Sequence, residues 1–301
     1  MVKHDRPVGS KPRWLKTRIP SHPNYFAVLK IVRENNLHTI CQSARCPNIG
    51  HCWAEKTATF LIMGDICTRN CSFCAVAKGT PRPLNSQEPE SVAKAARTMG
   101  LKYAVITSVT RDDLPDGGAL HFAQTIKAIR KLTPQTKVEV LIPDFQGVID
   151  SLKTVLEAQP DVLNHNLEVP ERIYPRINRP PYFFKRSLEI LQSAKEAGLI
   201  TKSGLMVGLG ETEKDLVDTF EALSKVACDL LTIGQYLQPT KNNYPVIKYY
   251  SPREFDYLKK LALDFGFQAV ESGPLVRSSY HAAKMADKIK TPKREIEGNA
   301  P

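Results

Sequence analysis

Short apolar or β-branched runs alternate with helix-length amphipathic segments along most of the chain. Six runs predict buried strands, at 57–63, 103–107, 137–142, 161–165, 203–207 and 229–233. Amphipathic segments between them predict helices, among them 91–99, 120–132, 184–197 and 213–226. In the last of these, Leu216, Phe220 and Leu223 form one apolar stripe, because they fall at i, i+4 and i+7. This alternation predicts a parallel sheet with right-handed crossover connections.

Six strands are too few to close an eight-stranded barrel. The predicted fold is therefore an α/β, open, partial (β/α)6 TIM-like barrel of parallel strands. We expect the barrel at 56–270, an N-terminal extension at 1–55 and a C-terminal extension at 271–301. The N-terminal extension is punctuated by prolines and predicts irregular chain with one helix at about 24–34. The residues after Ala283 are rich in lysine and arginine and predict a basic, frayed end.

Polar or glycine-rich residues follow directly after the predicted strands. They are Thr107-Ser108, Pro143-Asp144, Asn164-His165-Asn166, Gly208-Leu209-Gly210 and Gly234-Gln235. Ligands of parallel α/β folds bind at the carboxyl ends of the strands. We therefore expect the chemistry of this protein at these positions.

Composition and charge add a bias toward acidic partners. The proportions of residues are ordinary for a globular chain, and no apolar run approaches the ~18 residues that a membrane span needs. The start of the chain lacks the apolar stretch of a secretory signal, so we expect a cytoplasmic protein without a membrane partner. Lys and Arg exceed Asp and Glu by 42 to 31, a net charge of +11, and residues 1–20 hold six of these cations and one Asp. No nucleic-acid-binding signature accompanies this charge, so we expect no nucleic acid partner.

The cysteines carry the strongest chemical signal. Six of the seven lie between positions 41 and 74, and an odd number crowded into one window favours metal ligation over disulfides. The loop Cys67-Thr-Arg-Asn-Cys71-Ser-Phe-Cys74 follows the first predicted strand directly. Its three thiolates match three corners of a cubane and leave one iron open to a substrate or cofactor. Zinc is the alternative, although a structural zinc site uses four ligands.

A second set of thiols lies upstream, at Cys41, Cys46 and Cys52. It also lacks an obvious fourth ligand, because His51 is adjacent to Cys52 and simultaneous ligation by both would be strained. The remaining Cys228 begins an apolar strand and is expected to be a small buried hydrophobic residue.

The loop at 67–74, with Phe73 before its last cysteine, resembles the signature of the radical S-adenosylmethionine enzymes. The resemblance implies a partial barrel with this loop after its first strand. It also implies that Cys67, Cys71 and Cys74 hold a [4Fe-4S] cluster whose fourth iron is chelated by the methionine end of the cofactor. Reductive cleavage of the cofactor then gives methionine and a 5′-deoxyadenosyl radical.

Both cysteine triads together resemble, more narrowly, the lipoyl synthase family. The likeness continues over nearly the whole chain in seven further stretches: Arg13-Trp-Leu-Lys16, Thr107-Ser-Val-Thr-Arg-Asp-Asp-Leu-Pro-Asp-Gly-Gly-Ala119, Glu139-Val-Leu-Ile-Pro-Asp144, Asn164-His-Asn-Leu-Glu168, Thr201-Lys-Ser-Gly-Leu-Met-Val-Gly-Leu-Gly-Glu-Thr212, Gly234-Gln-Tyr-Leu-Gln-Pro239 and Gly273-Pro-Leu-Val-Arg-Ser-Ser-Tyr-His281. A match at so many separated stretches is specific.

This resemblance implies insertion of two sulfurs, at C6 and C8 of an octanoyl chain on a carrier protein, with two S-adenosylmethionine molecules consumed. It implies a second, auxiliary [4Fe-4S] cluster that donates the sulfur and is held by Cys41, Cys46, Cys52 and Ser279, with Ser278 left open as the alternative. Ser279 is thus expected to act in catalysis together with the radical triad. Residues expected to bind the cofactor are Phe73, Thr107, Ser108, Asn164, Asn166, Glu168, Gly208 and Gly210. Asp116-Gly-Gly118 is expected beside its methionine end, and a plain turn stays open as the alternative. For Arg172, Arg176 and Arg179, a solvated loop and contact with an acidic protein or the cofactor carboxylate both stay open.

The implied partners are octanoylated lipoyl carrier domains, either 2-oxoacid dehydrogenase E2 or glycine cleavage H protein. A flavodoxin- or ferredoxin-type reductant and an iron-sulfur carrier for cluster repair are also implied. The N-terminal basic segment is hypothesised to steer acidic partners. Three alternatives remain at this point: another radical sulfur inserter of the biotin synthase or methylthiotransferase kind, an iron-sulfur electron carrier, and a zinc-bearing nucleic-acid module. Iron and sulfide analysis separates the last two, since two cubanes need about eight irons.

Overall fold

The computed structural model of this chain describes residues 10–17 and 19–289. Its main sheet has the order β1-β2-β5-β6-β7-β8-β9-β10. Six strands of this sheet pair in parallel and match the six predicted strands. They are β2 Thr59–Ile62, β5 Tyr103–Ser108, β6 Lys137–Leu141, β7 Val162–Asn164, β8 Ile200–Val207 and β9 Leu230–Gln235. The predicted α/β fold with open parallel strands is confirmed.

Two edge strands extend this sheet beyond the six that were predicted. Strand β10 (Ala269–Gly273) continues the parallel order beside β9, and β1 (His38–Thr39) pairs antiparallel with β2. The sequence pattern missed β10 because only Ala269 and Val270 of its five residues are apolar and buried. β10 also crosses the boundary expected at residue 270. The two edges do not pair, so the barrel stays open.

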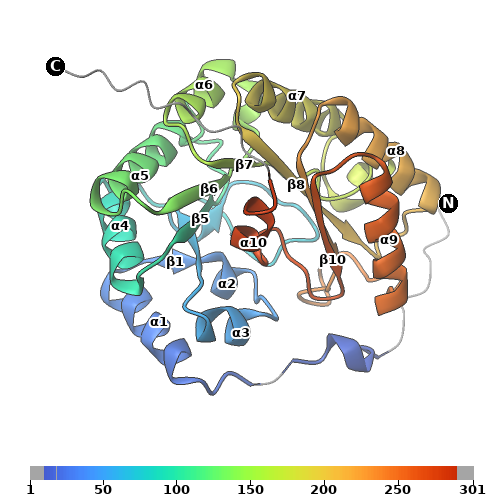
Figure 1. The fold of residues 1–301 in the computed structure, drawn as a ribbon, viewed down its shortest axis with the longest axis horizontal. Coiled ribbons are helices and arrows are strands. Elements are labelled where there is room, and N and C mark those ends of the chain that lie inside the picture. The colour runs from blue at the N-terminus through green and yellow to red at the C-terminus, as the bar shows by residue number, and fades with distance from the viewer. Residues whose placement is uncertain (1–9, 18, 290–301) are drawn as a thin grey trace.

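Helices that follow the strands cover the outside of the sheet. They are α4 Glu88–Met99, α5 Ala119–Leu132, α6 Ile149–Glu157, α7 Tyr182–Glu196, α8 Glu213–Lys225 and α9 Pro252–Asp264, with the short 3-10 helices η2 Phe145–Gly147 and η3 Glu171–Ile177 between them. Figure 1 shows them as an outer ring around the strands. The stripe of Leu216, Phe220 and Leu223 is buried, as predicted. Strands buried on both faces explain why the sequence shows continuous apolar runs instead of alternation.

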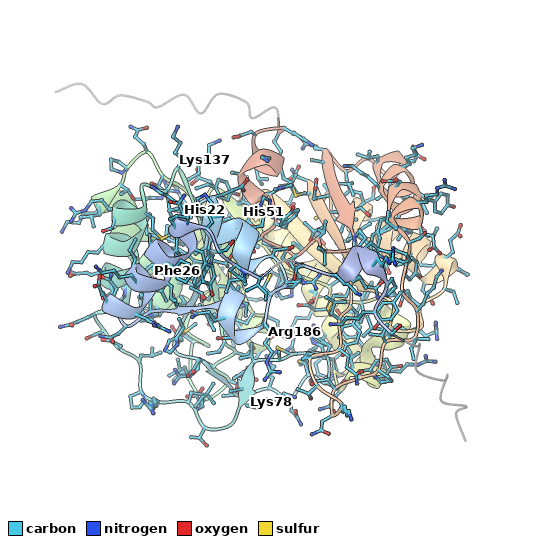
Figure 2. All side chains as sticks on the ribbon, turned by 90° about the horizontal axis from the view of Figure 1, so that it is seen from below. His22, Phe26, His51, Lys78, Lys137 and Arg186 are labelled. Carbon is cyan, nitrogen blue, oxygen red and sulfur yellow. The ribbon has the colours of Figure 1, made fainter. Side chains whose placement is uncertain are left out.

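The N-terminal extension lies across the open side of the barrel, between β1 and β10 (Figures 1 and 2). It contains η1 Arg13–Leu15, α1 Pro23–Glu34, α2 Ile40–Ser43 and α3 Ile49–Ala54. The prediction of irregular chain with one helix was therefore incomplete. Two further short helices carry Cys41 and Cys52, and the Thr39 side chain accepts a hydrogen bond from the Gln42 backbone at the start of α2.

The C-terminal segment packs against the amino ends of the strands. Helix α10 (Ala282–Ala286) buries Met285 and Ala286 against Val162 and Leu230. The expectation of a frayed end is therefore wrong for residues 284–286, and residues 290–301 lie outside the described part. Among the described residues, no helix is long and apolar enough to cross a membrane.

Candidate active site

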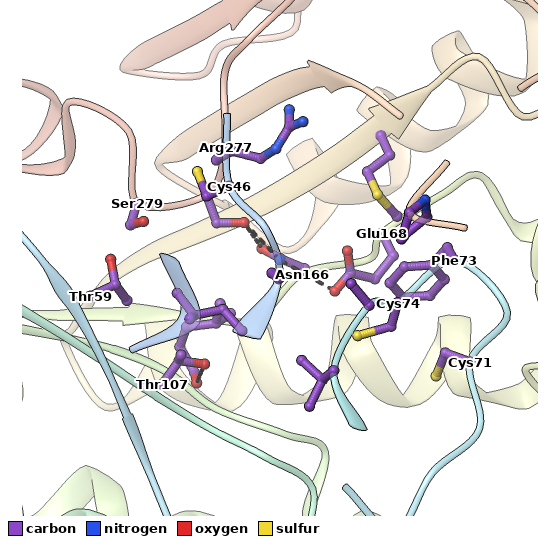
Figure 3. Close-up of a pocket in the computed structure, with 18 of the residues that line it drawn as sticks. Cys46, Thr59, Cys71, Phe73, Cys74, Thr107, Asn166, Glu168, Arg277 and Ser279 are labelled. Atoms are coloured by element: carbon purple, nitrogen blue, oxygen red, sulfur yellow. Dashed lines mark hydrogen bonds between the residues drawn. The ribbon is translucent and has the colours of Figure 1, made fainter. Parts of the chain in front are cut away.

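A cavity of about 570 Å3 opens at the carboxyl ends of the strands, where the sequence placed the chemistry. Figure 3 shows part of its lining. It is lined by all three cysteines of the 67–74 loop and by Cys41, Cys46 and Ser279. The 67–74 cysteines and two of the three upstream cysteines therefore face the same space, although they come from different parts of the fold.

The 67–74 loop is tied down at many points along its backbone. Two-residue strands β3 (Ile66–Cys67) and β4 (Ala77–Lys78) pair at its two ends. Thr68 donates from its backbone to Thr110, and Ser72 donates to Ile177. The Asn243 side chain donates to the carbonyls of Ser72 and Cys74 at 3.0 and 3.1 Å. These contacts hold the three thiols in a defined arrangement.

Arg69 adds a charged tether to the same loop, which the sequence reasoning did not single out. Its guanidinium binds both oxygens of Asp112, at 2.7 and 2.9 Å, and Asp144 at 2.5 Å. Arg186 of α7 binds the other oxygen of Asp144 at 3.0 Å. These contacts hold the pKa of Asp144 at about 2, despite its burial. The position of Arg69 between Cys67 and Cys71 was the available signal.

Burial makes the free thiols poor acids. It raises the pKa of Cys74 to about 12 and also raises that of Cys71, although Arg179 opposes the shift at Cys71. Without a metal these side chains are protonated at neutral pH and are weak nucleophiles. Iron binding releases the proton, so the donor set fits metal ligation better than covalent catalysis.

The upstream cysteines surround a second, smaller cavity of about 20 Å3. Its lining includes Cys41, Cys46, Cys52 and Ser279, and Figure 3 shows Ser279 facing the side of Cys46. Burial raises the pKa of Cys41 to about 11 and that of Cys52 to about 12. Among the described residues, no three His, Cys, Asp or Glu side chains converge on a single metal position. A cubane does not require this, because each cysteine binds a different iron.

The structure separates the two neighbouring serines. The Ser278 hydroxyl is hydrogen-bonded to the Asn166 side chain: it lies 2.8 Å from the donor Nδ2 and 3.1 Å from the acceptor Oδ1. Ser279 has no such side-chain partner in the described part and lines both cavities. The two serines that the sequence left open as the fourth ligand thus have different surroundings.

Several residues predicted to bind the cofactor line the large cavity: Phe73, Thr107, Ser108, Asn164, Asn166 and Glu168. Ser108 Oγ and Asn164 Oδ1 are buried polar atoms without a partner in the described residues, and Arg179 Nε is a third. The Asn164 amide donates to Glu139 at 3.1 Å, which turns its oxygen away from that carboxylate. Unpartnered buried polar atoms are costly, so these three fit a polar ligand.

Glu168 lies in this cavity with unusual backbone geometry. Its φ of 70° is in the left-handed region, which non-glycine residues rarely adopt and which is often retained at functional sites. Burial raises the pKa of its carboxyl group, while Arg179 and the Asn166 amide act in the opposite direction. A carboxylate held this way is suited to a cationic or hydroxyl-bearing ligand.

Other predicted residues lie outside both cavities. Gly208 and Gly210 do not line them; a Cβ on Gly208 would lie 2.4 Å from the Lys248 carbonyl oxygen, so this glycine serves close internal packing. Asp116 accepts from the backbone N–H groups of Gly118 and Leu120, which is a turn and helix-start role. Its expected place beside the methionine end is not supported by the cavity lining.

The three clustered arginines divide into two kinds. Arg172 binds Asp215 and the Gly210 carbonyl on the surface, and Arg176 is exposed. Arg179 lines the cavity and stacks near the rings of Tyr174 and Phe183, at 5.5 and 5.4 Å.

Sequence comparisons identify relatives over almost the whole chain. The model of the radical SAM superfamily matches residues 61–223, and that of the N-terminal domain of lipoyl synthase of the radical SAM family matches residues 3–46. The lipoyl synthase of Rubrobacter xylanophilus is 53% identical over 287 residues, which cover 95% of this chain and 89% of that protein. The chain belongs to the lipoyl synthase family. The lipoyl synthase of Caldicellulosiruptor bescii is also 53% identical, over 93% of this chain and 96% of that protein.

Membership of the lipoyl synthase family makes the protein a radical SAM enzyme, with S-adenosylmethionine and [4Fe-4S] clusters as cofactors. Solved structures agree at the level of the fold. HydG, a maturase of the [FeFe]-hydrogenase, is 12% identical with a TM-score of 0.56, over 88% of this chain and 74% of that one. Methylornithine synthase (PylB) is 14% identical with a TM-score of 0.54, over 79% and 76%.

Proposed function

We propose that this chain inserts sulfur at C6 and C8 of an octanoyl group attached to a lysine of a carrier protein. One observation carries the proposal: the radical triad and two cysteines of the upstream triad line a single cavity. An acyl chain in that cavity lies between the site of hydrogen abstraction and the source of sulfur. When bound, the two clusters and two molecules of S-adenosylmethionine supply the electrons, the carbon radical and the inserted sulfur.

In this proposal Cys67, Cys71 and Cys74 hold the radical cluster. Arg179 is the cation beside Cys71 and suits the carboxylate of the cofactor. Glu168 suits its ammonium or ribose hydroxyls. The Ser108 hydroxyl can accept from or donate to its polar groups, and Asn164 Oδ1 can accept from them. Thr107, Asn166 and Phe73 also line the cavity, whereas Gly208 acts through packing against Gln235 and Gly210 through packing against Arg176 and Ile247.

The upstream triad and Ser279 are proposed to hold the auxiliary cluster. The support for Ser279 over Ser278 is that Ser279 borders the small cavity with all three cysteines, whereas Ser278 is bonded to Asn166. An oxygen ligand binds iron less well than thiolate does in such clusters. We propose that this corner opens when sulfur is delivered.

The proposed partners follow from the chemistry and the charge around the cavity. Its lining includes three cations toward the outside, Lys11, Arg45 and Lys78, and its two acids, Asp144 and Glu168, face inward. This arrangement suits the acidic surface of an E2 or H-protein carrier domain. A flavodoxin- or ferredoxin-type reductant and an iron-sulfur carrier for repair complete the set, and a cytoplasmic location stays a prediction.

The decisive experiment is anaerobic incubation with S-adenosylmethionine, a low-potential reductant and an octanoylated carrier. Mass spectrometry is expected to show two sulfurs gained, with 5′-deoxyadenosine released. Two variants divide the reaction: Cys71→Ala should abolish 5′-deoxyadenosine formation, and Cys46→Ala should retain it without sulfur gain. Unchanged octanoyl chains on a protein with both clusters intact would refute the proposal.

A further inference from the structure

Arg277 lies between the two cavities and lines both of them. Its Nη1 donates to the carbonyl oxygens of Val276 at 2.6 Å and Gln235 at 3.3 Å. Figure 3 shows Arg277 next to Cys46, with its guanidinium directed away from that thiol in this view. A Cβ on Gly234 would lie 2.2 Å from the Val276 oxygen and 3.4 Å from this Nη1. The missing side chain of Gly234 therefore makes room for the arginine.

Arg277 differs in its charge partners from Arg69, Arg111 and Arg186, and shares with Arg179 the lack of an ion pair among the described residues. Arg69, Arg111 and Arg186 each form an ion pair with an aspartate. Within residues 10–17 and 19–289, no carboxylate oxygen lies within 4.0 Å of the Arg277 guanidinium, and Arg277 lines the small cavity together with Cys46. Arginine stays charged at any pH that a folded protein experiences, and an uncompensated buried charge is costly.

The surroundings of the small cavity show where a compensating anion arises. Arg277 is the one lysine, arginine, aspartate or glutamate among the residues that line it. Iron binding converts three thiols into thiolates and so brings negative charge next to the guanidinium.

We propose that Arg277 is the counter-charge of the auxiliary site, stabilising its anionic ligand set and favouring the more reduced state of the cluster held there. The inference rests on the proposed function. When a carbon radical forms a bond with a sulfide, carbon and sulfur each contribute one electron to the bond. The sulfide then keeps one negative charge instead of two, and the released electron reduces one ferric ion to ferrous. A cation beside the site favours this added electron. Arg277 is thus a positioning and electrostatic residue.

The test measures the auxiliary site alone, in the full chain carrying Cys67→Ala, Cys71→Ala and Cys74→Ala. Three further changes are compared in that background after anaerobic loading with iron and sulfide. Arg277→Met removes the charge at similar length, Arg277→Lys keeps it, and Arg33→Met removes a charge from the exposed face of α1. A redox titration followed by electron paramagnetic resonance should show a more negative midpoint potential for Arg277→Met, with values near the parent for the other two.

Two results would overturn the inference. One is an Arg277→Met chain with parental iron content and an unchanged potential. The other is loss of iron in both Arg277→Met and Arg277→Lys, because then shape and not charge is required. Loss of iron in Arg277→Met with retention in Arg277→Lys supports the counter-charge. The titration needs no carrier or turnover, so its outcome is independent of the sulfur-insertion assay that tests the proposed function.

Discussion

Asn48 donates a hydrogen bond from Nδ2 to the carbonyl oxygen of Leu275 at 2.6 Å, across 227 positions of sequence. Asn48 lies between Cys46 and Cys52, and Leu275 lies four residues before Ser279. The bond therefore joins the segment that holds the upstream cysteines to the segment that holds the proposed oxygen ligand. It is a direct structural link between the two ends of the chain.

Replacing Asn48 with alanine should loosen the auxiliary site. The change leaves the Leu275 carbonyl without its partner, at a cost of about 1–3 kcal/mol. We expect faster loss of auxiliary iron to a chelator, with the cluster at Cys67, Cys71 and Cys74 unaffected. Asn35→Ala is the matched control, since that side chain bonds only to the nearby Ile31 carbonyl. Equal iron loss from the two variants would contradict the linking role.

Ser279→Cys should retain the auxiliary cluster and slow sulfur transfer. Thiolate binds iron more firmly than a seryl oxygen, so opening of that corner becomes harder. A barrier raised by ~1.4 kcal/mol corresponds to about a tenfold slower rate of product formation in single turnover. Ser278→Cys is the control, because that serine is bonded to Asn166. This variant should not combine a retained auxiliary cluster with slower product formation. Product formation at the parental rate by Ser279→Cys would show that a labile oxygen ligand is not required.

The barrel interior contains a fully buried ion pair, in which Lys202 Nζ lies 2.9 Å from Glu139 Oε1. Tyr103 donates to the other oxygen at 2.7 Å. Lys202→Met should lower the free energy of unfolding by about 3–5 kcal/mol, because it leaves the carboxylate buried without its cation. Adding Glu139→Gln should recover part of this loss in denaturant unfolding. Lys214→Met, at an exposed pair with Asp218, serves as the control. A loss no larger than that of the control would show that the pair is not a structural charge centre.

His165 should make stability depend on pH. Burial lowers its pKa from 6.5 to about 4, with Asp144 opposing the shift and Arg69 and Arg179 adding to it. The neutral ring is fully paired, since Nδ1–H donates to the Ile142 carbonyl and the Ser187 hydroxyl donates to Nε2.

The unfolded chain binds a proton at this histidine below about pH 6.5, and the folded chain does so only below about pH 4. The stabilisation is therefore complete above pH 6.5 and is lost as the pH falls toward 4, by about 2 kcal/mol at pH 5. Urea unfolding at pH 7.5 and pH 5 measures this difference, which should be smaller in His165→Gln. His22→Gln, at an exposed histidine, is the control. If the loss of stability between pH 7.5 and pH 5 is equal in the His22→Gln and His165→Gln variants, the assignment to His165 is contradicted.

Carrier binding should depend on ionic strength through the cations at the cavity. We expect the on-rate of an octanoylated carrier to fall as salt rises, because exposed charges are screened over about 10 Å at 0.1 M. Lys78→Glu should lower this on-rate further, and Lys127→Glu on the outer face of α5 should not. A short octanoyl-lysine peptide should react equally well with both variants. A salt-independent on-rate would reject electrostatic steering. Three of the six cations in the hypothesised N-terminal segment, Lys3, Arg6 and Arg18, lie outside the described part.

The sequence alone determined the barrel and the identity of the chemistry. Continuous apolar runs specify parallel strands buried on both faces, and this local pattern placed the six strands and the stripe of α8 correctly. It could not identify β10, where only Ala269 and Val270 are apolar and buried, because that strand is stabilised by its pairing with β9. It also gave α10 as a frayed end, although Met285 is buried by contacts from three distant strands.

The spacing of the cysteines likewise predicts two iron-binding sets, since ligand type and local spacing are properties of the chain itself. The sequence could not show that Cys46, Cys71 and Ser279 border one cavity, that Ser278 is bonded to Asn166, or that Arg277 has no carboxylate partner among the described residues. These relationships join positions separated by up to more than two hundred residues. Only the tertiary structure decides them, because burial, charge pairing and cavity shape are set by which distant segments pack together.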